Sequence, residues 1–415
     1  MSKRLWVFRN SCNTPITNTA NVDRRRFIQS SLAMGAATWA AGSLLEGCAA
    51  PASVQAPKYQ GKRLVLISLD GGHDGLHAIA PKNNDVLAKL RPKIYADTLQ
   101  NGIPISLASQ SDFVLHRNLK PWLGSLEKEE FRIIPNVGLP LNEWNGSHFV
   151  SQDFWSMAEY EGNRNPEGVK GTGWIGRLLG REAMQIKDFK RTAIAMNTLT
   201  PLVLQGNPVS GVAWPGLEAA ETMQGELTGW LENVSPIENN GVFQEMADLS
   251  KVYQWLGKSS PAVGFPASGL GLQLAHAATL IQQDMPFKVI KCSAGGFDTH
   301  SGQLVAHEGN YPQMAESLSA FHRFLAEAGL LEQTLVVVYS EFGRTIYENS
   351  ALGTEHGTAG PMYVIGGGKA LSQFTNRPFV FETEKLAGTD TTDYLKHQID
   401  FRDVFSEIQR NWLGV

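Results

Sequence analysis

The chain has 415 residues, 42% of them hydrophobic and 18% charged, with a formal net charge of −4. This composition suits an ordinary globular protein with a large core, in one large domain or two. Residues 1–47 hold six of the 36 basic side chains but only two of the 40 acidic ones, so the rest of the chain is acidic. An acidic body without basic runs argues against nucleic acid as a partner.

The cysteines exclude two kinds of site. There are three, at Cys12, Cys48 and Cys292. The first two lie in a segment that has the features of a processed leader, so the folded part keeps a single thiol. We therefore expect neither a disulfide nor a cysteine-based zinc site within that folded part.

The first 47 residues have the layout of an export signal. The run 23–29, Asp-Arg-Arg-Arg-Phe-Ile-Gln, matches the twin-arginine pattern, and a weakly apolar segment rich in Ala and Gly follows over 30–45. That segment is too short and its side chains are too small for a stable transmembrane span. Twin-arginine substrates are exported already folded, often with a metal or cofactor inserted. We therefore predict a signal peptide over 1–47, the export machinery as a partner, and a periplasmic or extracellular location.

The end of the leader allows two outcomes. The four residues that end at Cys48 resemble a lipobox, which would anchor the mature protein to a membrane by a lipid on that cysteine, although Glu46 fits the pattern poorly. Cleavage among the small residues of 49–56 is the alternative. In both cases 48–62 reads as a tether rich in Pro, Ser and Gln, and 63–415 as a single folded domain.

The domain opens with a mostly apolar run over 64–69, which predicts a strand buried on both faces, as in a parallel sheet. It ends in Asp70, two glycines, His73 and Asp74, where the glycines allow a tight turn. Ligands bind at that edge of open α/β sheets. A metal ion would partner buried carboxylates there, while a solvated turn explains the same residues.

Other apolar runs predict the remaining elements. Strands are expected over 131–138, 192–196, 287–292, 334–340 and 362–365, and helices over 243–256, 270–283, 312–330 and 403–413. Their alternation predicts an α/β fold with a mainly parallel central sheet flanked by helices. The segment 198–265, rich in Pro, Gly, Asn and Glu, is expected to be an insertion or a cap over the site.

Ser147 stands before a run that allows a helix, and it is a plausible N-cap. Helix N-termini offer free backbone N–H groups and a positive dipole end, which phosphate and sulfate groups favour. The Ser147 hydroxyl is therefore a candidate nucleophile, although capping alone explains a serine at this position.

Acids and histidines follow several predicted strands at the point where each strand ends. They are Asp70, Asp74, Asp298, His300, Glu341 and His356. Because the carboxyl ends of parallel strands meet at one edge of a sheet, these side chains can converge there. Mixed carboxylate and imidazole ligands suit a divalent ion such as zinc, manganese or calcium. The sequence predicts such a metal site; loop capping and salt bridges are the alternative.

Six features occur in a fixed order along the chain. They are the twin-arginine leader and the segments 70–76, 147–155, 296–300, 340–345 and 355–360. In this order they resemble the DUF1501 family, a group of exported bacterial proteins similar in fold to the alkaline phosphatase/sulfatase superfamily. The resemblance extends over essentially all of 63–415.

This resemblance implies a metal-dependent hydrolase of phosphate or sulfate esters, with the six acids and histidines as metal ligands. Ser147 or a metal-bound water would attack the ester, His148 would assist the leaving group, and Arg344 would neutralise oxyanion charge with its planar fork. The superfamily's Asp-His pair falls on Glu341 and Phe342, which loses an imidazole. That departure favours an alternative: a non-catalytic exported binding or assembly protein with a degraded site.

Overall fold

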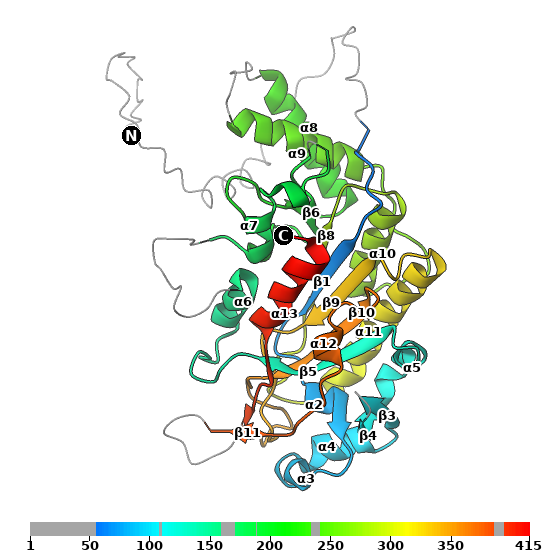
Figure 1. Cartoon of the computed structure of the whole chain (residues 1–415), viewed down its shortest axis with the longest axis vertical. Helices are drawn as coiled ribbons and strands as arrows, with labels where there is room; N and C mark the ends of the chain where they lie inside the picture. Colours follow the sequence, from blue (N-terminus) through cyan, green and yellow to red (C-terminus); the bar gives the residue numbers. More distant parts are fainter. Residues whose placement is uncertain (1–54, 108–109, 159–170, 188, 234–240, 386–393) are drawn as a thin grey trace, which may run out of the picture. The chain divides into compact units, whose positions relative to one another are not determined.

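The computed structural model describes residues 55–107, 110–158, 171–187, 189–233, 241–385 and 394–415. The predicted leader, Cys48 and the first part of the tether lie outside these residues. The described chain is built on one eight-stranded sheet (Figure 1). The order of the strands across the sheet is β13 (Ile399–Asp400), β5 (Phe131–Gly138), β10 (Gly360–Gly366), β9 (Thr334–Tyr339), β1 (Arg63–Leu69), β8 (Val289–Ala294), β6 (Ala193–Ala195) and β7 (Val212–Ala213).

Strand β1 lies at the centre of this sheet and pairs in parallel with β8 on one side and β9 on the other. Its side chains alternate between two cores. Val65, Ile67 and Leu69 pack into one core, while Leu64 and Leu66 pack into the other. All five are at most 1% exposed, which explains the unbroken apolar run. The predicted α/β fold with a mainly parallel sheet is confirmed.

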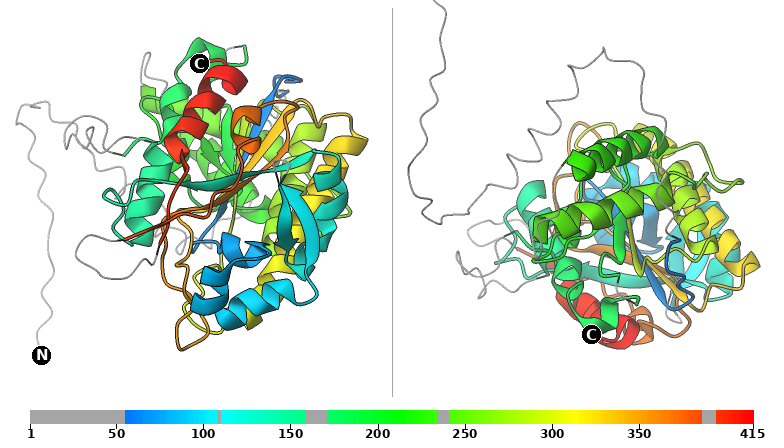
Figure 2. Two further views of the ribbon diagram at one scale, coloured as in Figure 1. Left: turned by 60° about the horizontal axis from the view of Figure 1, so that its bottom comes forward. Right: turned by 90° about the horizontal axis from the view of Figure 1, so that it is seen from above.

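Helices cover both faces of the sheet (Figures 1 and 2). The face of Val65 packs against α9 (Gly241–Leu256), α10 (Gly269–Gln282) and α11 (Gln303–Glu327). The other face packs against α6 (His148–Met157), α7 (Trp174–Leu178) and α13 (Phe401–Glu407). A π-helical turn, Ile408–Leu413, continues α13. None of the helices in the described ranges is long and apolar enough to cross a membrane.

Strand β10 is antiparallel to both of its neighbours, β9 and β5. It therefore starts at the sheet edge where β9 ends, and the loop 340–359 begins and ends at that edge. The carboxyl ends of β1, β8 and β9 and this loop thus share one place. The segments expected to carry the site residues meet there.

Smaller elements complete the described chain. The short helix α2 (Gly75–Ala78) follows β1, and β2 (Ile79–Pro81) joins β4 (Gln110–Leu115) and β3 (Ile103–Leu107) in a three-stranded antiparallel sheet. The remaining helices are α3 (Asp85–Leu90), α4 (Pro92–Leu99), α5 (Leu123–Glu127), α8 (Leu217–Asn233) and α12 (Ser372–Thr375). Strands β11 (Thr383–Glu384) and β12 (Tyr394–Leu395) form a separate pair.

The segment 198–265, expected to be an insertion or cap, is divided between two places. Pro201, Leu202 and Val203 line a cavity at the carboxyl edge of the sheet. Helices α8 and α9 pack on each other instead (Figure 1). Glu245 of α9 pairs with Arg191, which precedes β6, so α9 reaches the amino end of that strand.

Candidate metal centre

The site is assembled by loops that leave the carboxyl edge of the sheet. Asp298 and His300 follow β8, and His356 lies in the loop between β9 and β10. The turn after β1 runs against Asp298, and its Gly71 has φ +119°. A Cβ atom at Gly71 would lie 2.4 Å from the backbone nitrogen of Asp298. Glycine is therefore required for the loops to pack this closely.

Three ligand atoms converge at this edge. The Nε2 atom of His300 lies 2.9 Å from Asp298 Oδ1 and 2.9 Å from His356 Nε2. His356 Nε2 in turn lies 3.3 Å from the same carboxylate oxygen. One carboxylate oxygen and two ring nitrogens are therefore close enough together to bind a single metal ion.

The opposite ring nitrogens determine which tautomers these histidines adopt. His300 Nδ1 lies 2.6 Å from Glu355 Oε2, and His356 Nδ1 lies 2.6 Å from the carbonyl oxygen of Gly146. Both partners accept hydrogen bonds, so each Nδ1 carries the proton in the neutral ring. Both Nε2 atoms then present lone pairs to each other and to the Asp298 carboxylate. Such a set can hold a cation at its centre, and the residues fit a divalent metal.

His148, the first residue of α6, adds a third imidazole. Its Nδ1 lies 2.9 Å from Glu341 Oε1, and its Nε2 lies 3.3 Å from Asp298 Oδ2. Within the described chain, this buried Nε2 atom has no hydrogen-bond partner. His148 was expected to assist a leaving group, but its orphaned nitrogen points to the shared carboxylate and makes it a candidate fourth ligand.

Charge around the centre favours an ionised Asp298. Burial raises the pKa of this carboxyl, but the hydrogen bond and charge of Arg344 outweigh that effect, and the pKa falls to about 2. Burial also lowers the pKa of His356, so that ring stays neutral. A carboxylate beside a neutral imidazole is the protonation state in which both can bind a metal.

We expect the Glu355→Gln variant to bind its metal about 10- to 100-fold more weakly, because a neutral amide orients the His300 ring less firmly and makes it less basic. Competition against a chromogenic chelator measures this affinity. Glu308→Gln is the matched control, since Glu308 pairs with Arg117 on another surface. An unchanged affinity for Glu355→Gln would contradict the assignment of the His300 tautomer.

Glu341 was expected to be a metal ligand, and its contacts correct this. Its carboxylate accepts hydrogen bonds from the backbone nitrogens of Gly71 and Gly72 at 2.9 and 3.3 Å. It also accepts from Ser340 Oγ at 2.9 Å and from Gln152 Nε2 at 3.2 Å. With His148 added, both oxygens are occupied by protein donors. Glu341 therefore holds the turn after β1 and orients His148.

Asp74 also lies outside the centre, contrary to expectation. Both of its oxygens accept from Arg91 Nη1, at 3.0 and 2.9 Å, and Gln303 Nε2 donates to Oδ2 at 2.7 Å. Its side chain also caps α2 by accepting from the backbone nitrogens of Leu76 and His77. Burial raises the pKa of Asp74, but Arg91 outweighs it and the pKa is lowered. Asp74 is a structural carboxylate.

Asp70 lies beyond Glu341 and lines a cavity together with Lys291. Burial raises the pKa of its carboxyl, and the charge of Lys291 partly offsets this. The structure thus brings Asp298, His300, His356 and His148 together, and it places Asp70 next to them on the cavity side.

Arg344 was expected to neutralise a substrate oxyanion, but its donors are used within the protein. Nε donates to Gly72 O at 2.8 Å, and Nη1 donates to Thr354 O at 3.0 Å. Nη2 contacts Asp298 Oδ1 at 2.7 Å and the carbonyls of Gly71 and Phe297. The side chain is fully buried. Arg344 therefore connects three loops through hydrogen bonds and holds Asp298 in place.

Ser147 stands between two residues of the centre. Gly146 accepts the hydrogen bond from His356, and His148 faces Asp298. Ser147 is the N-cap residue of α6, but its side chain makes no capping hydrogen bond. The capping explanation for this serine is therefore not realised, and Ser147 stands at a helix N-terminus between Gly146 and His148.

A second histidine cluster was missed by the sequence reading. His77 Nε2 and His116 Nε2 each lie 3.1 Å from Asp97 Oδ2. His116 Nδ1 accepts from the backbone nitrogen of Asn118 at 3.2 Å, so its Nε2 carries the proton and donates to Asp97. His77 Nδ1 lies 2.7 Å from His307 Nδ1. His307 Nε2 is buried and has no hydrogen-bond partner within the described chain, and the ligand atoms of His77, Asp97 and His116 are close enough together to form a second candidate metal triad.

Buried histidines predict a strong pH dependence of stability. Burial lowers the pKa of His73 and of His116 to about 4. Since an unfolded histidine titrates near 6.5, the unfolded chain binds more protons between these values. The free energy of unfolding should therefore fall as pH drops from 6.5 to 4, by about 3 kcal/mol for a fully buried histidine such as His73.

Denaturant unfolding of chelator-treated protein at several pH values tests this expectation. His116→Gln should show a shallower fall, while His322→Gln, altered at a histidine that pairs with Glu130 elsewhere, should keep the wild-type slope. Stability that does not change across this pH window would contradict the neutral, buried state of these rings.

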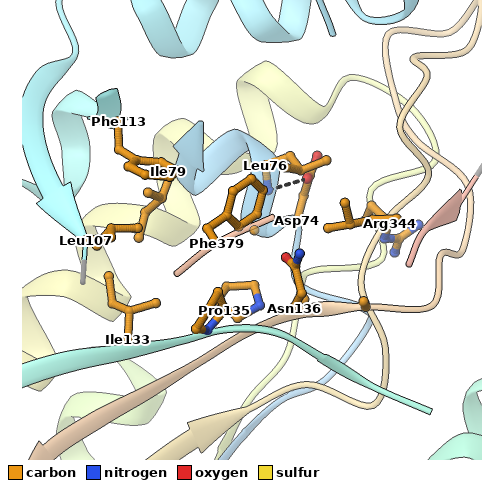
Figure 3. Close-up of a pocket in the computed structure, with 15 residues that line it drawn as sticks. Asp74, Leu76, Ile79, Leu107, Phe113, Ile133, Pro135, Asn136, Arg344 and Phe379 are labelled. Atoms are coloured by element: carbon orange, nitrogen blue, oxygen red, sulfur yellow. Dashed lines mark hydrogen bonds between the residues drawn. The ribbon is translucent and has the colours of Figure 1, made fainter. Parts of the chain in front are cut away.

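An apolar pocket lies beside Asp74 and is shown in Figure 3. Ile79, Phe113, Ile133 and Phe379 are among its lining residues, and its volume is about 30 Å³. This space is large enough for one or two water molecules only. It does not provide a substrate site.

The chain was compared with known proteins. None of the curated proteins matches it. Three solved structures align with most of the chain: the C-terminal periplasmic domain of EcEptC from Escherichia coli in complex with zinc, the lipoteichoic acid synthase LtaP from Listeria monocytogenes, and the sulfatase PsFucS1 from Pseudoalteromonas sp..

The sequence identities to these three are 8, 11 and 12%, and the TM-scores are 0.39, 0.33 and 0.33. The alignments cover 88, 87 and 86% of this chain and 84, 74 and 68% of theirs, in the same order. Residues 257–372 match the model of the family described as "Protein of unknown function (DUF1501)", which confirms the resemblance to DUF1501 over that segment.

Proposed function

We propose that this protein is an exported, metal-dependent hydrolase of phosphate or sulfate esters. One observation carries the proposal. Lone-pair nitrogens of His148, His300 and His356 converge on the Asp298 carboxylate, and Ser147, the N-cap residue of α6, directly precedes His148 in the chain. Three imidazoles with one carboxylate suit zinc or manganese better than calcium, which prefers oxygen ligands.

Each group has a part in the reaction. When bound, the ion would polarise an oxygen of the ester and stabilise charge that develops in the transition state. The Ser147 oxygen attacks phosphorus or sulfur in line while the bond to the alcohol oxygen breaks, and the alcohol leaves with the proton that the serine hydroxyl gives up. Backbone N–H groups at the start of α6 stabilise the transferred anionic group. Water then hydrolyses the ester formed on Ser147, which restores the serine.

The experiment that tests this proposal is a panel of aryl phosphates and aryl sulfates, assayed with zinc, manganese and calcium. We expect turnover of at least one ester class with zinc or manganese, and loss of that turnover on chelation. A protein that binds metal tightly and turns over no ester in the panel would contradict hydrolysis.

Ser147→Ala is expected to lower kcat by about 10³-fold or more, because an activated nucleophile is removed, while metal content stays at the wild-type level. Mass spectrometry of acid-quenched wild-type enzyme should show a phosphorylated or sulfated Ser147. A full rate in Ser147→Ala would instead assign the attack to water and remove the role of the serine.

One observation favours the rival reading, a binding or assembly protein with a degraded site. The resemblance to the superfamily would place an imidazole at the position of Phe342. Its ring packs against His148 and His356, with centroids 4.8 and 4.7 Å apart. With Glu341 occupied by other donors, a second ion lacks ligands here. Metal binding without turnover in the panel is the result that this rival predicts.

The export route belongs to the proposal as well. Residues 1–47 would direct the folded, metal-loaded protein through the twin-arginine machinery to the periplasm or beyond, with cleavage or lipidation near Cys48. Replacing Arg24 and Arg25 by lysine should retain the protein in the cytoplasm. Export that continues unchanged in this variant would contradict the twin-arginine assignment.

A further inference from the structure

A cavity of about 270 Å³ opens next to the metal centre on the α6 side of the sheet. Its walls come from the carboxyl ends of β1, β8, β6 and β9, from α6, and from residues 201–203. Glu341 lines the cavity and also holds His148, so the two sites share a wall. This volume is close to the range of small-molecule sites.

Lys291 is an unusual residue for its position in this wall. It lies on β8 opposite Leu66, on the face of the sheet that forms a buried core, and is only 7% exposed. Its Nζ donates to Ser68 Oγ at 2.8 Å and to the carbonyl oxygen of Cys292. Burial lowers the pKa of this amine to about 8, although the charge of Asp70 works in the other direction. An ammonium carries three N–H groups, so one donor remains beside the cavity.

Trp155 forms another part of the cavity wall. The side chain is 2% exposed and lines the same cavity, and its indole Nε1 has no hydrogen-bond partner in the described chain. The ring stacks between Tyr339 and Phe401, which fixes its position. The indole nitrogen has almost no accessible surface, so it is the ring of Trp155 that forms part of the cavity wall.

The lining as a whole selects the kind of ligand. Carboxylates of Asp70, Asp153 and Glu341 face one ammonium, Lys291, which disfavours a simple anion. The ammonium equally disfavours a simple cation. The other polar lining groups are amides and hydroxyls, contributed by Gln152, Asn197, Ser68, Ser156, Ser293 and Tyr339. A neutral group with several hydroxyls can donate to the Asp70 carboxylate and accept from the amine and the amides.

We propose that this cavity binds a polyhydroxylated group of the size of a sugar ring. If the proposed hydrolysis holds, on which this further step rests, that group is the alcohol part of the ester. The substrate class is then a phosphorylated or sulfated sugar or polyol. The shared wall at Glu341 places the bond to be cleaved at the metal centre and the hydroxylated part in the cavity.

The test separates binding from catalysis by using metal-free protein. Saturation-transfer NMR and thermal shift are recorded for chelator-treated full-length protein with glucose, galactose and glycerol, and with benzoate and cyclohexanol as anionic and apolar probes. We expect at least one of glucose, galactose and glycerol to bind, and neither benzoate nor cyclohexanol to bind. Lys291→Met should weaken that binding by about tenfold or more, as loss of one charge-assisted hydrogen bond does.

Two further variants keep the result interpretable. Ser156→Phe, on α6, should fill the cavity and abolish binding even if Lys291→Met does not fold. Lys288→Met removes a charge whose amine bonds to Ala183 O outside the cavity, and it should bind as wild type does. No binding of any hydroxylated probe, binding unaffected by Ser156→Phe, or preference for benzoate would each overturn the proposal. Sugar binding that persists without ester turnover would refute the hydrolase and leave the cavity assignment standing.

Discussion

Replacing both Asp298 and His356 by alanine is expected to abolish metal binding by the purified protein. Asp298 Oδ1 and His356 Nε2 are two of the converging ligand atoms, and Asp298 also faces His148 and His300. Losing a residue that only orients a ligand costs about 10- to 100-fold in metal affinity, and losing two ligands should cost far more. Ester turnover should disappear together with the metal.

Elemental analysis of the folded, exported protein measures the metal directly. His322→Ala is the matched control, because His322 pairs with Glu130 elsewhere on the chain, and it should keep the full metal content. Circular dichroism verifies that the double variant is folded. Unchanged metal in the double variant, or no metal in the wild type, would refute the centre.

Much of the fold was predictable because its signals are local. The strand after Lys62, the strand over 131–138 and the helix after Ser147 appear where the apolar pattern predicts them. Burial on both faces explains the unbroken runs of β1 and β9. Helix α11, by contrast, begins at Gln303, nine residues before its predicted start, and Pro312 lies inside it. Packing of Tyr311 and Met314 into the core outweighs the local cost of the proline.

The candidate site was predictable only to the level of loops. The pattern of strand ends brought Asp298, His300 and His356 to one edge, as parallel strands require. It could not separate Glu341, whose oxygens accept from backbone nitrogens across the loop, from a true ligand. Side-chain direction after a strand depends on which distant segment packs there, and sequence spacing does not carry that information.

The partners of Asp74 were also not predictable from the sequence. Asp74 was expected to be a metal ligand, yet Arg91 and Gln303 bind its carboxylate. Arg91 is 17 residues away in the sequence and Gln303 is 229 residues away. A buried carboxylate requires a partner, but the sequence does not determine whether that partner is a metal or an arginine. The second histidine cluster was missed for the same reason.

Arg344→Met is expected to lower the free energy of unfolding by several kcal/mol, at about 1–3 kcal/mol for each buried carbonyl left without a donor. The guanidinium donates to the carbonyls of Gly71, Gly72, Phe297 and Thr354 and to the Asp298 carboxylate. Methionine fills part of the volume and leaves these acceptors without donors. Each buried acceptor left unpaired carries its own desolvation cost.

Denaturant unfolding in the presence of a chelator measures this loss without a contribution from metal binding. Arg344→Lys should give an intermediate loss, because an ammonium has three donors and lacks the planar fork that spans the loops. Arg410→Met is the control, since Arg410 is 64% exposed, and its stability should stay within about 0.5 kcal/mol of wild type. If Arg344 bound the substrate oxyanion instead, Arg344→Lys would lower kcat and leave stability unchanged. If Arg344→Met loses more stability than Arg410→Met, and Arg344→Lys loses stability without a specific loss of kcat, this arginine holds the loops of the metal centre together.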